Sequence, residues 1–364
     1  MLPDVTLQRE IETRLASYRD TYLEVELGKI KAIKRVTIEK DRVDVEIVLG
    51  YPHESIKDNM IASLTDYLAP IASSKAINIK LTAQIDAHSG RQGLAGLPNV
   101  KNIVAVASGK GGVGKSTIAI NLALALAKDG ATVGLLDADI YGPSQPAMLG
   151  TAGEKPVIQD RRIQPIIRHG IQSISIGNLV DANAALAWRG PMLGKALEQL
   201  IHDTQWEKLD YLVVDLPPGT GDVQLTLCQK IPVSGAVIVT TPQDLALLDV
   251  RRACEMLNKL NVPVLGVVEN MSVYHCSHCG HEERIFGEGG GDKLAAEYGL
   301  ASLASVPLNI RIREMTDSGN PPVVQDAESQ AGKIFCEMAR KVAAKLALQT
   351  KDYSSRFPKI VVEK

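Results

Sequence analysis

A glycine-rich segment carries the residues whose types and spacing point to the most specific chemistry. It reads Ser108-Gly-Lys-Gly-Gly-Val-Gly-Lys-Ser-Thr117, and Gly109, Gly114, Lys115 and Ser116 satisfy the pattern G-x-x-x-x-G-K-[ST]. Glycines let backbone N–H groups wrap a polyphosphate without obstruction from Cβ atoms, and a following helix adds partial positive charge. We therefore expect a nucleotide site in which Lys115 contacts the β- and γ-phosphates and the Ser116 hydroxyl binds Mg²⁺.

Two acidic segments follow apolar runs that have the character of buried strands. One run, from Thr132, ends in Asp137-Ala-Asp139, and another, from Tyr211, ends in Asp215. We expect Asp215 to bind Mg²⁺ through water, Asp137 to support the metal shell and Asp139 to position the attacking water. Taken alone, each aspartate is equally typical of a helix N-cap or a turn.

A C-x-x-C pair in His275-Cys276-Ser-His-Cys279-Gly-His281 could hold a metal ion or a cluster. Isolated cysteines are usually buried small hydrophobic residues. The other three cysteines are of this kind: Cys228, Cys254 and Cys336. A closed tetrathiolate site needs four sulfurs, so a second copy of the chain is the simplest source of the missing two.

The residues alone leave several alternatives for what the Cys276 and Cys279 pair binds. A [4Fe–4S] cluster shared by two chains would fit. Zinc is favoured by the neighbouring histidines, bound either with His275 or His281 in one chain or by four cysteines across two chains. A redox-active dithiol and a metal-free loop are also compatible with the spacing.

The elements that must position these residues fall into two groups along the chain. From residue 100 onward, five continuous apolar runs alternate with helix-length stretches, which predicts an α/β fold with a mostly parallel sheet flanked by helices. Ligands of such sheets bind beyond the carboxyl ends of the strands. Alternating patterns before residue 88 predict a small α+β domain. The expected organisation is 1–87 for the small domain, 88–99 for a linker, 100–348 for the large domain and 349–364 for a C-terminal tail.

Composition and charge exclude several classes of protein. The 364 residues are 45% hydrophobic and 23% charged, which excludes disorder throughout. The net charge of −2 gives no global reason to expect nucleic acid or an anionic membrane as a partner. No run approaches the roughly 20 apolar residues that a bilayer crossing needs, and the charged first 20 residues are unlike a secretory signal. We expect a cytoplasmic protein.

The phosphate loop resembles a known group of ATPases. Lys110-Gly-Gly-Val-Gly-Lys-Ser is similar to the deviant Walker A motif of nitrogenase iron protein and of the cell-division positioning and plasmid-partition ATPases. In that group the lysine equivalent to Lys110 reaches the nucleotide of the partner subunit, so the resemblance implies ATP as ligand, a catalytic role for Lys110 and a homodimer. It also implies that Asn270, in Glu269-Asn-Met-Ser, reads adenine. The full expected nucleotide-binding set is Gly109, Lys110, Gly111, Gly112, Val113, Gly114, Lys115, Ser116, Thr117 and Asn270.

The order of motifs narrows the resemblance further. The motifs from Ser108 to Gly291 run SGKGGVGKS, DADIYGPS, DLPPGTGD, TTPQDLALLDV, VENMS, CxxCGH and FGEGGG. Over residues 95–345 this order resembles the Mrp/ApbC family of iron–sulfur cluster carrier ATPases. The resemblance implies that Cys276 and Cys279 hold a [4Fe–4S] cluster that is delivered to apo iron–sulfur proteins, with cluster donors as further partners. The leading domain resembles a small iron–sulfur assembly domain, although it contains no cysteine, and Ser277 replaces a proline common in the family.

Two different classes of function compete with this interpretation. A spatial-organisation ATPase would assemble on DNA or on a membrane, for which the candidate surface is the helix predicted over residues 332–346. A zinc-stabilised dimer would act as an assembly scaffold without transferring a cluster. Arg189, in Trp188-Arg-Gly-Pro-Met, is a candidate for a contact with a partner or with a switch segment. A structural salt bridge explains it equally well.

Overall fold

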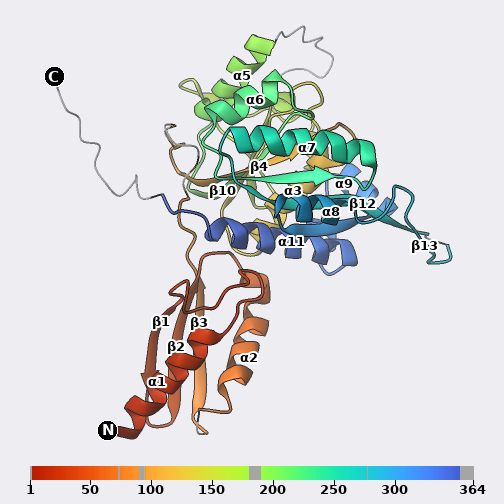
Figure 1. Ribbon diagram of the computed structural model, residues 1–364. Helices are drawn as coiled ribbons and strands as arrows, with labels where there is room; N and C mark the ends of the chain where they lie inside the picture. Colours follow the sequence, from red (N-terminus) through yellow and green to blue (C-terminus); the bar gives the residue numbers. More distant parts are fainter. Residues whose placement is uncertain are drawn as a thin grey trace.

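We describe the protein from a computed structural model, in which a small N-terminal unit lies beside a larger α/β unit (Figure 1). The described residues are 2–72, 74–88, 90, 94, 96–179, 190–276 and 278–352. Arg189, Ser277 and residues 353–364 of the predicted tail lie outside them, as do several positions of the predicted linker. The division into domains at residues 88 and 100 stays a prediction.

The small unit is a three-stranded sheet covered by two helices. Strand β2 pairs antiparallel with β1 and parallel with β3, and inward side chains alternate with exposed ones along β2, as in a sheet with one wet face. The buried positions of β2 are Val43, Val45, Ile47 and Leu49. The elements are α1 (Leu2–Ser17), β1 (Ile33–Ile38), β2 (Arg42–Leu49), η1 (Glu54–Ile56), α2 (Lys57–Leu68) and β3 (Ala76–Ala83).

The large unit is built on a nine-stranded sheet in the order β13-β12-β11-β4-β10-β5-β9-β8, with β14 pairing with β12. Its ladders are parallel except for β12 with β13 and β8 with β9. The strands are β4 (Val100–Ser108), β5 (Val133–Asp137), β8 (Ile166–Arg168), β9 (Ile171–Ser175), β10 (Leu209–Asp215), β11 (Gly235–Thr240), β12 (Val264–His275), β13 (Glu282–Glu283) and β14 (Ser302–Leu308). A separate pair is β6 (Ile158–Gln159) with β7 (Arg162–Ile163).

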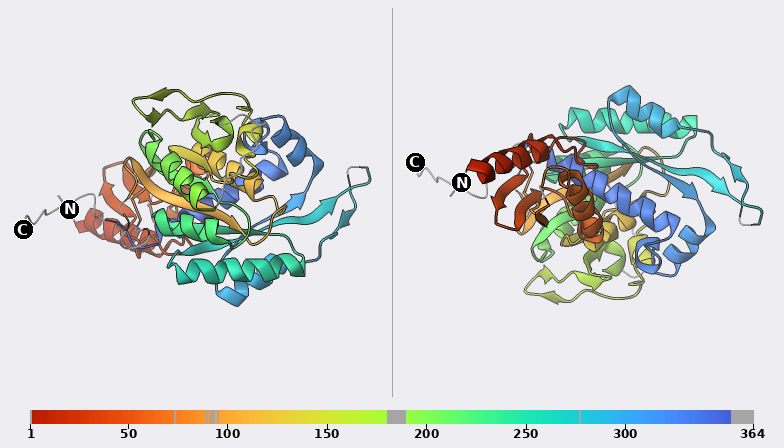
Figure 2. Two further views of the ribbon diagram at one scale, coloured as in Figure 1. Left: turned by 90° about the horizontal axis from the view of Figure 1, so that it is seen from above. Right: turned by 90° about the horizontal axis from the view of Figure 1, so that it is seen from below.

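Helices cover both faces of this sheet (Figure 2). One buried apolar cluster includes α3 and α11, and a second on the opposite face includes α5, α6 and α7. This arrangement confirms the predicted α/β fold class with a mostly parallel sheet flanked by helices. Within the described residues, no helix combines the length and the apolarity that crossing a membrane requires. The helices are α3 (Lys115–Lys128), α4 (Gln145–Met148), η2 (Ile176–Asn178), α5 (Gly190–Asp203), α6 (Asp222–Lys230), α7 (Asp244–Lys259), α8 (Gly290–Tyr298), α9 (Ile310–Asp317), α10 (Pro322–Gln325) and α11 (Gln330–Ala347).

The two units share one apolar core and a buried ionic contact. The cluster that contains α3 and α11 continues into the small unit. At its edge, Arg340 on α11 donates hydrogen bonds to Asp129 Oδ2 at 2.8 Å, to the Tyr22 hydroxyl at 3.1 Å and to Ser55 Oγ at 3.0 Å. Asp129 is the C-cap of α3, where a negative charge opposes the helix dipole. Arg340 therefore compensates a buried carboxylate and joins both units at the C-terminal end of α3.

This contact predicts the effect of removing its cation. Arg340→Met would leave the Asp129 carboxylate, which is 2% exposed, without a compensating charge. We expect the free energy of unfolding to fall by about 3 kcal/mol, because breaking a buried ion pair leaves an uncompensated charge. Urea unfolding of the intact chain, followed by circular dichroism, measures the loss.

Lys345→Met on the same helix is the matched control. Lys345 pairs with Glu24, whose side chain is 59% exposed, so its removal is expected to cost less than about 1 kcal/mol. Equal urea midpoints for the two variants would contradict the role assigned to Arg340.

Candidate nucleotide and metal site

The phosphate loop lies between β4 and α3, at the carboxyl edge of the sheet. It adopts a left-handed backbone at two glycines, with φ of +81° at Gly112 and +80° at Gly114. A Cβ atom on Gly114 would lie 2.2 Å from Asn270 Nδ2, and one on Gly109 would lie 2.2 Å from the carbonyl carbon of Asp249. Conformation therefore favours glycine at position 112, close packing requires it at position 109, and both apply at position 114.

A cavity of about 200 Å³ opens over this loop at the N-terminus of α3. Such a position favours anions, because free N–H groups and the helix dipole both point toward it. The cavity brings together most of the predicted phosphate-loop residues and Asp139, whereas Gly109 and Val113 do not line it. Its lining is Ser108, Lys110, Gly111, Gly112, Gly114, Lys115, Ser116, Thr117, Asp139, Ser144, Met148 and Pro218. Lys110 is exposed, which leaves its side chain accessible.

The sheet register places two of the predicted metal carboxylates next to each other. Asp215 ends β10 and is in register with Asp137 at the end of β5, and both side chains are fully buried. Lys115 Nζ lies 2.5 Å from Asp215 Oδ1. The pKa of Asp137 is raised, first because burial disfavours its charged form and second because Asp215 is beside it. Lys115 thus pairs with one of two adjacent buried carboxyl groups, that of Asp215.

Asp139 continues this acidic group toward the cavity. Its backbone N–H donates to Asp137 Oδ1 at 3.1 Å. The pKa of its carboxyl group is raised, chiefly by burial, while the charge of Lys115 acts in the opposite direction. Oxygen ligands of this kind, beside a loop of N–H donors, fit a magnesium ion with a nucleotide polyphosphate. The individual roles of Asp137, Asp139 and Asp215 stay predictions.

Two residues of this site were not identified from the sequence. The Ser175 hydroxyl donates to Asp137 Oδ2 at 3.0 Å, because Ser175 ends β9 in register with Asp137. Gln145, 2% exposed at the start of α4, donates from Nε2 to Asp215 Oδ2 at 2.9 Å and to Ser116 O at 3.1 Å. The signal for Ser175 was its position at a strand end. Gln145 follows the acidic segment directly and could have been considered with it.

Asn270 lies against the phosphate loop. It belongs to β12, is 7% exposed, and donates from Nδ2 to Val113 O at 2.9 Å. This hydrogen bond connects β12 to the loop through a side chain. Its predicted contact with adenine stays a prediction.

The two cysteines of the C-x-x-C pair lie on a hairpin that extends β12 away from the body of the protein (Figures 1 and 2). Cys276 N–H donates to His281 O, and Gly280 N–H donates to Cys276 O, both at 2.9 Å. Gly280 has a φ of +73°, which closes the turn. Cys279 is exposed and Cys276 is half-buried. The hairpin therefore presents both thiols at a projecting surface.

Local hydrogen bonds favour the thiolate of Cys276. Its pKa is lowered, first by the backbone N–H of Cys279 and then by that of His278. Burial has the opposite effect on the three buried thiols, raising the pKa of Cys228 to about 12 and that of Cys254 to about 11, and also raising that of Cys336. The folded chain thus favours the thiolate form at Cys276 and disfavours it at the three buried cysteines.

Within the described residues, the C-x-x-C pair has no third metal-binding side chain grouped with it. Among the described residues, no group of three or more His, Cys, Asp or Glu side chains is arranged to hold a metal ion. His275 Nδ1 instead lies 3.3 Å from Glu282 Oε1. The single-chain zinc site with His275 or His281 and a site shared by two chains both stay predictions.

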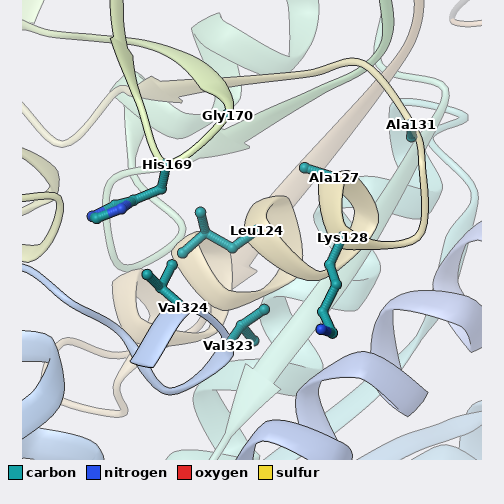
Figure 3. Close-up of a pocket in the computed structure, with 8 residues that line it drawn as sticks. All are labelled: Leu124, Ala127, Lys128, Ala131, His169, Gly170, Val323 and Val324. Atoms are coloured by element: carbon teal, nitrogen blue, oxygen red, sulfur yellow. The ribbon is translucent and has the colours of Figure 1, made fainter. Parts of the chain in front are cut away.

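A separate cavity of about 330 Å³ lies along the C-terminal half of α3, away from the phosphate loop (Figure 3). Its lining contains no carboxylate and includes Lys128 and His169 among apolar side chains. His169 Nε2 lies 2.9 Å from Gly319 O. We do not assign this cavity to the nucleotide and metal site.

A phosphate loop on a parallel sheet, with carboxylates at the ends of the two adjacent strands, defines a P-loop NTPase. A family model described as "NUBPL iron-transfer P-loop NTPase" matches residues 99–343. A second model, described as "iron-sulfur cluster assembly protein", matches residues 8–81. The chain belongs to this family of iron-transfer P-loop NTPases. The matches confirm the resemblance inferred from the motifs, including that of the leading domain.

Similar proteins from several organisms cover most of the chain. An iron-sulfur cluster carrier protein of Escherichia coli K12 is 48% identical over 344 residues, which are 94% of this chain and 93% of that protein. A protein of the same name from Pseudomonas fragi is 56% identical over 282 residues, 77% of this chain and 97% of that protein. The mouse iron-sulfur cluster transfer protein NUBPL is 49% identical over 252 residues, 69% of this chain and 79% of that protein.

Solved structures show the same architecture for the large unit. A nucleotide-binding protein from Archaeoglobus fulgidus in complex with ADP is 37% identical with a TM-score of 0.57, over 65% of this chain and 93% of that chain. The cell-division ATPase MinD of Pyrococcus furiosus is 24% identical with a TM-score of 0.52, over 66% of this chain and 98% of that chain. The second likeness concerns the fold alone.

The lowered pKa of Cys276 predicts its reactivity. In a Cys279→Ser protein, which keeps the backbone donors, we expect iodoacetamide to alkylate Cys276 at half its maximal rate at a lower pH than in the urea-unfolded chain. The reason is that the thiolate, rather than the thiol, reacts, and the folded hairpin stabilises it. Peptide mapping by mass spectrometry resolves this site from the buried cysteines. An equal or higher half-maximal pH in the folded protein would contradict the assignment.

Proposed function

We propose that the protein is an ATP-binding and ATP-hydrolysing carrier that holds a [4Fe–4S] cluster between two copies of the chain and transfers it to apoproteins. The single observation that carries this proposal is the hairpin of Cys276 and Cys279, a half-complete thiolate site on the strand whose residue Asn270 contacts the phosphate loop. The names of the relatives support a carrier, and the family supports nucleotide binding.

The nucleotide half of the proposal rests on the phosphate loop and its carboxylates. Backbone N–H groups of residues 109–114 and Lys115 bind the polyphosphate, and Ser116 with Asp215 and Asp137 would hold Mg²⁺. When bound, this ion neutralises charge on the phosphates and on the carboxylates. Asp139, which lines the cavity, orients the attacking water. Lys110 is exposed and available to a second copy.

The cluster half of the proposal rests on ligand number. A [4Fe–4S] cluster is held by four cysteine sulfurs, and each chain presents two on its hairpin. A homodimer with its two-fold axis between the hairpins supplies all four. The cluster is then a cargo at an exposed surface, where cluster donors and apo iron–sulfur proteins have access to it.

Strand β12 offers a route by which the nucleotide affects the cargo. Asn270 bonds the phosphate loop, and Cys276 follows six positions later, beyond a bulge of β12 between Asn270 and Tyr274. A shift of the loop on ATP binding or hydrolysis would move one end of this strand and so alter the geometry between the two hairpins. If ATP and ADP stabilise different arrangements of the two hairpins, nucleotide state and cluster binding are coupled.

Iron loading tests the cluster site. After reconstitution with iron and sulfide without oxygen, we expect about one [4Fe–4S] cluster per two chains, and Cys276→Ala is expected to abolish it. Cys254→Ala is the matched control, because Cys254 is buried in α7 and is expected to leave the iron content unchanged. Iron and sulfide analysis with absorption spectroscopy provides the measurement. Full iron content in the Cys276→Ala protein would reject this site.

The same preparations separate the competing functions. Zinc in place of iron in protein purified without oxygen would favour a zinc-stabilised scaffold. ATP-dependent pelleting with DNA or with liposomes would favour a spatial-organisation ATPase, and the proposal expects neither. A cytoplasmic location is also part of the proposal.

A further inference from the structure

Two buried oxygen atoms beside the phosphate loop lack a hydrogen-bond partner. They are Gln145 Oε1 and Ser144 Oγ, and within the described part of the chain neither contacts a donor or acceptor. Ser144 lines the cavity over the loop, and Gln145 bonds Ser116 of that lining. A buried polar atom without a partner costs free energy, so its retention next to a binding site indicates that a ligand or water satisfies it there.

The chemistry of its neighbours fixes the orientation of the Gln145 amide. Both atoms within reach of Nε2, the Ser116 carbonyl oxygen and the Asp215 carboxylate oxygen, are acceptors, at 3.1 Å and 2.9 Å. The nitrogen must therefore face them with its two N–H groups. Oε1 is left on the other side of the amide as an acceptor that only a donor or a cation can satisfy.

We propose that Gln145 is a positioning residue for the magnesium ion of the nucleotide site, acting together with Ser144. Its Nε2 fixes Asp215 relative to Ser116, the two residues proposed to hold the ion, while Gln145 Oε1 and Ser144 Oγ accept hydrogen bonds from the hydration shell of Mg²⁺. The backbone N–H of Gln145 also donates to Asp137 Oδ2 at 3.2 Å, so one residue contacts three ligand-bearing positions. This inference rests on the proposed nucleotide function.

Metal affinity tests the inference without measuring hydrolysis. Mn²⁺ replaces Mg²⁺, and electron paramagnetic resonance gives its Kd for the complex of the protein with ADP. In Gln145→Met, which keeps the length but removes both polar atoms, we expect this Kd to rise by about 10-fold or more. ADP binding in EDTA is expected to stay the same, because the loop and Lys115 remain. An unchanged Kd for Mn²⁺ would overturn the inference.

A second variant separates the role of Oε1 from simple packing. Gln145→Glu loses the donor but keeps an oxygen at the free position. We expect it to bind Mn²⁺ more tightly than Gln145→Met does. Equal losses in both variants would show a structural role for the amide and overturn the inference.

Further variants keep the test decisive. Ser144→Ala removes the other unpaired oxygen with little change of volume and is expected to raise the Kd for Mn²⁺; it decides the question if Gln145→Met does not fold. Gln159→Met, on the exposed β6 strand, is the control for a glutamine outside the site and should match the parent protein.

If the parent protein itself binds no Mn²⁺ with ADP, the proposed nucleotide function fails. If it binds and the variants match it, only the role of Gln145 and Ser144 fails.

Discussion

The register that places Asp215 beside Asp137 is the constraint on which the rest of the structure depends. Two adjacent parallel strands end in fully buried carboxyl groups, and Lys115 forms an ion pair with one of them, Asp215. Two such groups in a low-dielectric environment repel one another unless a proton or a cation compensates them. A site with this charge pattern, facing a loop of N–H donors, is suited to a metal ion together with a polyanion.

Helix α3 and strand β12 connect this charged centre to the rest of the molecule. From its N-terminus at Lys115, α3 runs to Asp129, where Arg340 and Ser55 hold the small unit against it. Strand β12 runs from the contact of Asn270 with the loop to the hairpin of Cys276. The nucleotide site is therefore connected by one helix to the leading domain and by one strand to the hairpin that carries the thiols. This arrangement gives a physical basis for a carrier whose cargo site responds to nucleotide.

Much of the fold and of the site could be predicted from local sequence. The apolar runs gave the parallel strands, and the glycine pattern with Lys115 located the loop, because strand ends and phosphate loops have short-range signatures. Ser175 ends a strand and Gln145 follows the acidic segment, but their hydrogen bonds with Asp137 and Asp215 join residues 38 and 70 positions apart, and no local pattern specifies such partners. The bond of Arg340 with Asp129 joins residues 211 positions apart, and no local pattern encodes such a pair. The direction of the Asn270 amide likewise depends on packing.

The central claim is that two copies of the chain face each other and that their hairpins hold one iron–sulfur centre. Diffraction at the iron absorption edge, from crystals of the reconstituted protein grown without oxygen, tests this claim most directly. The account predicts a single anomalous peak on a molecular two-fold axis, within bonding distance of the Cys276 and Cys279 sulfurs of both copies. Iron located inside one chain, or hairpins that stand apart while iron binds elsewhere, would contradict it.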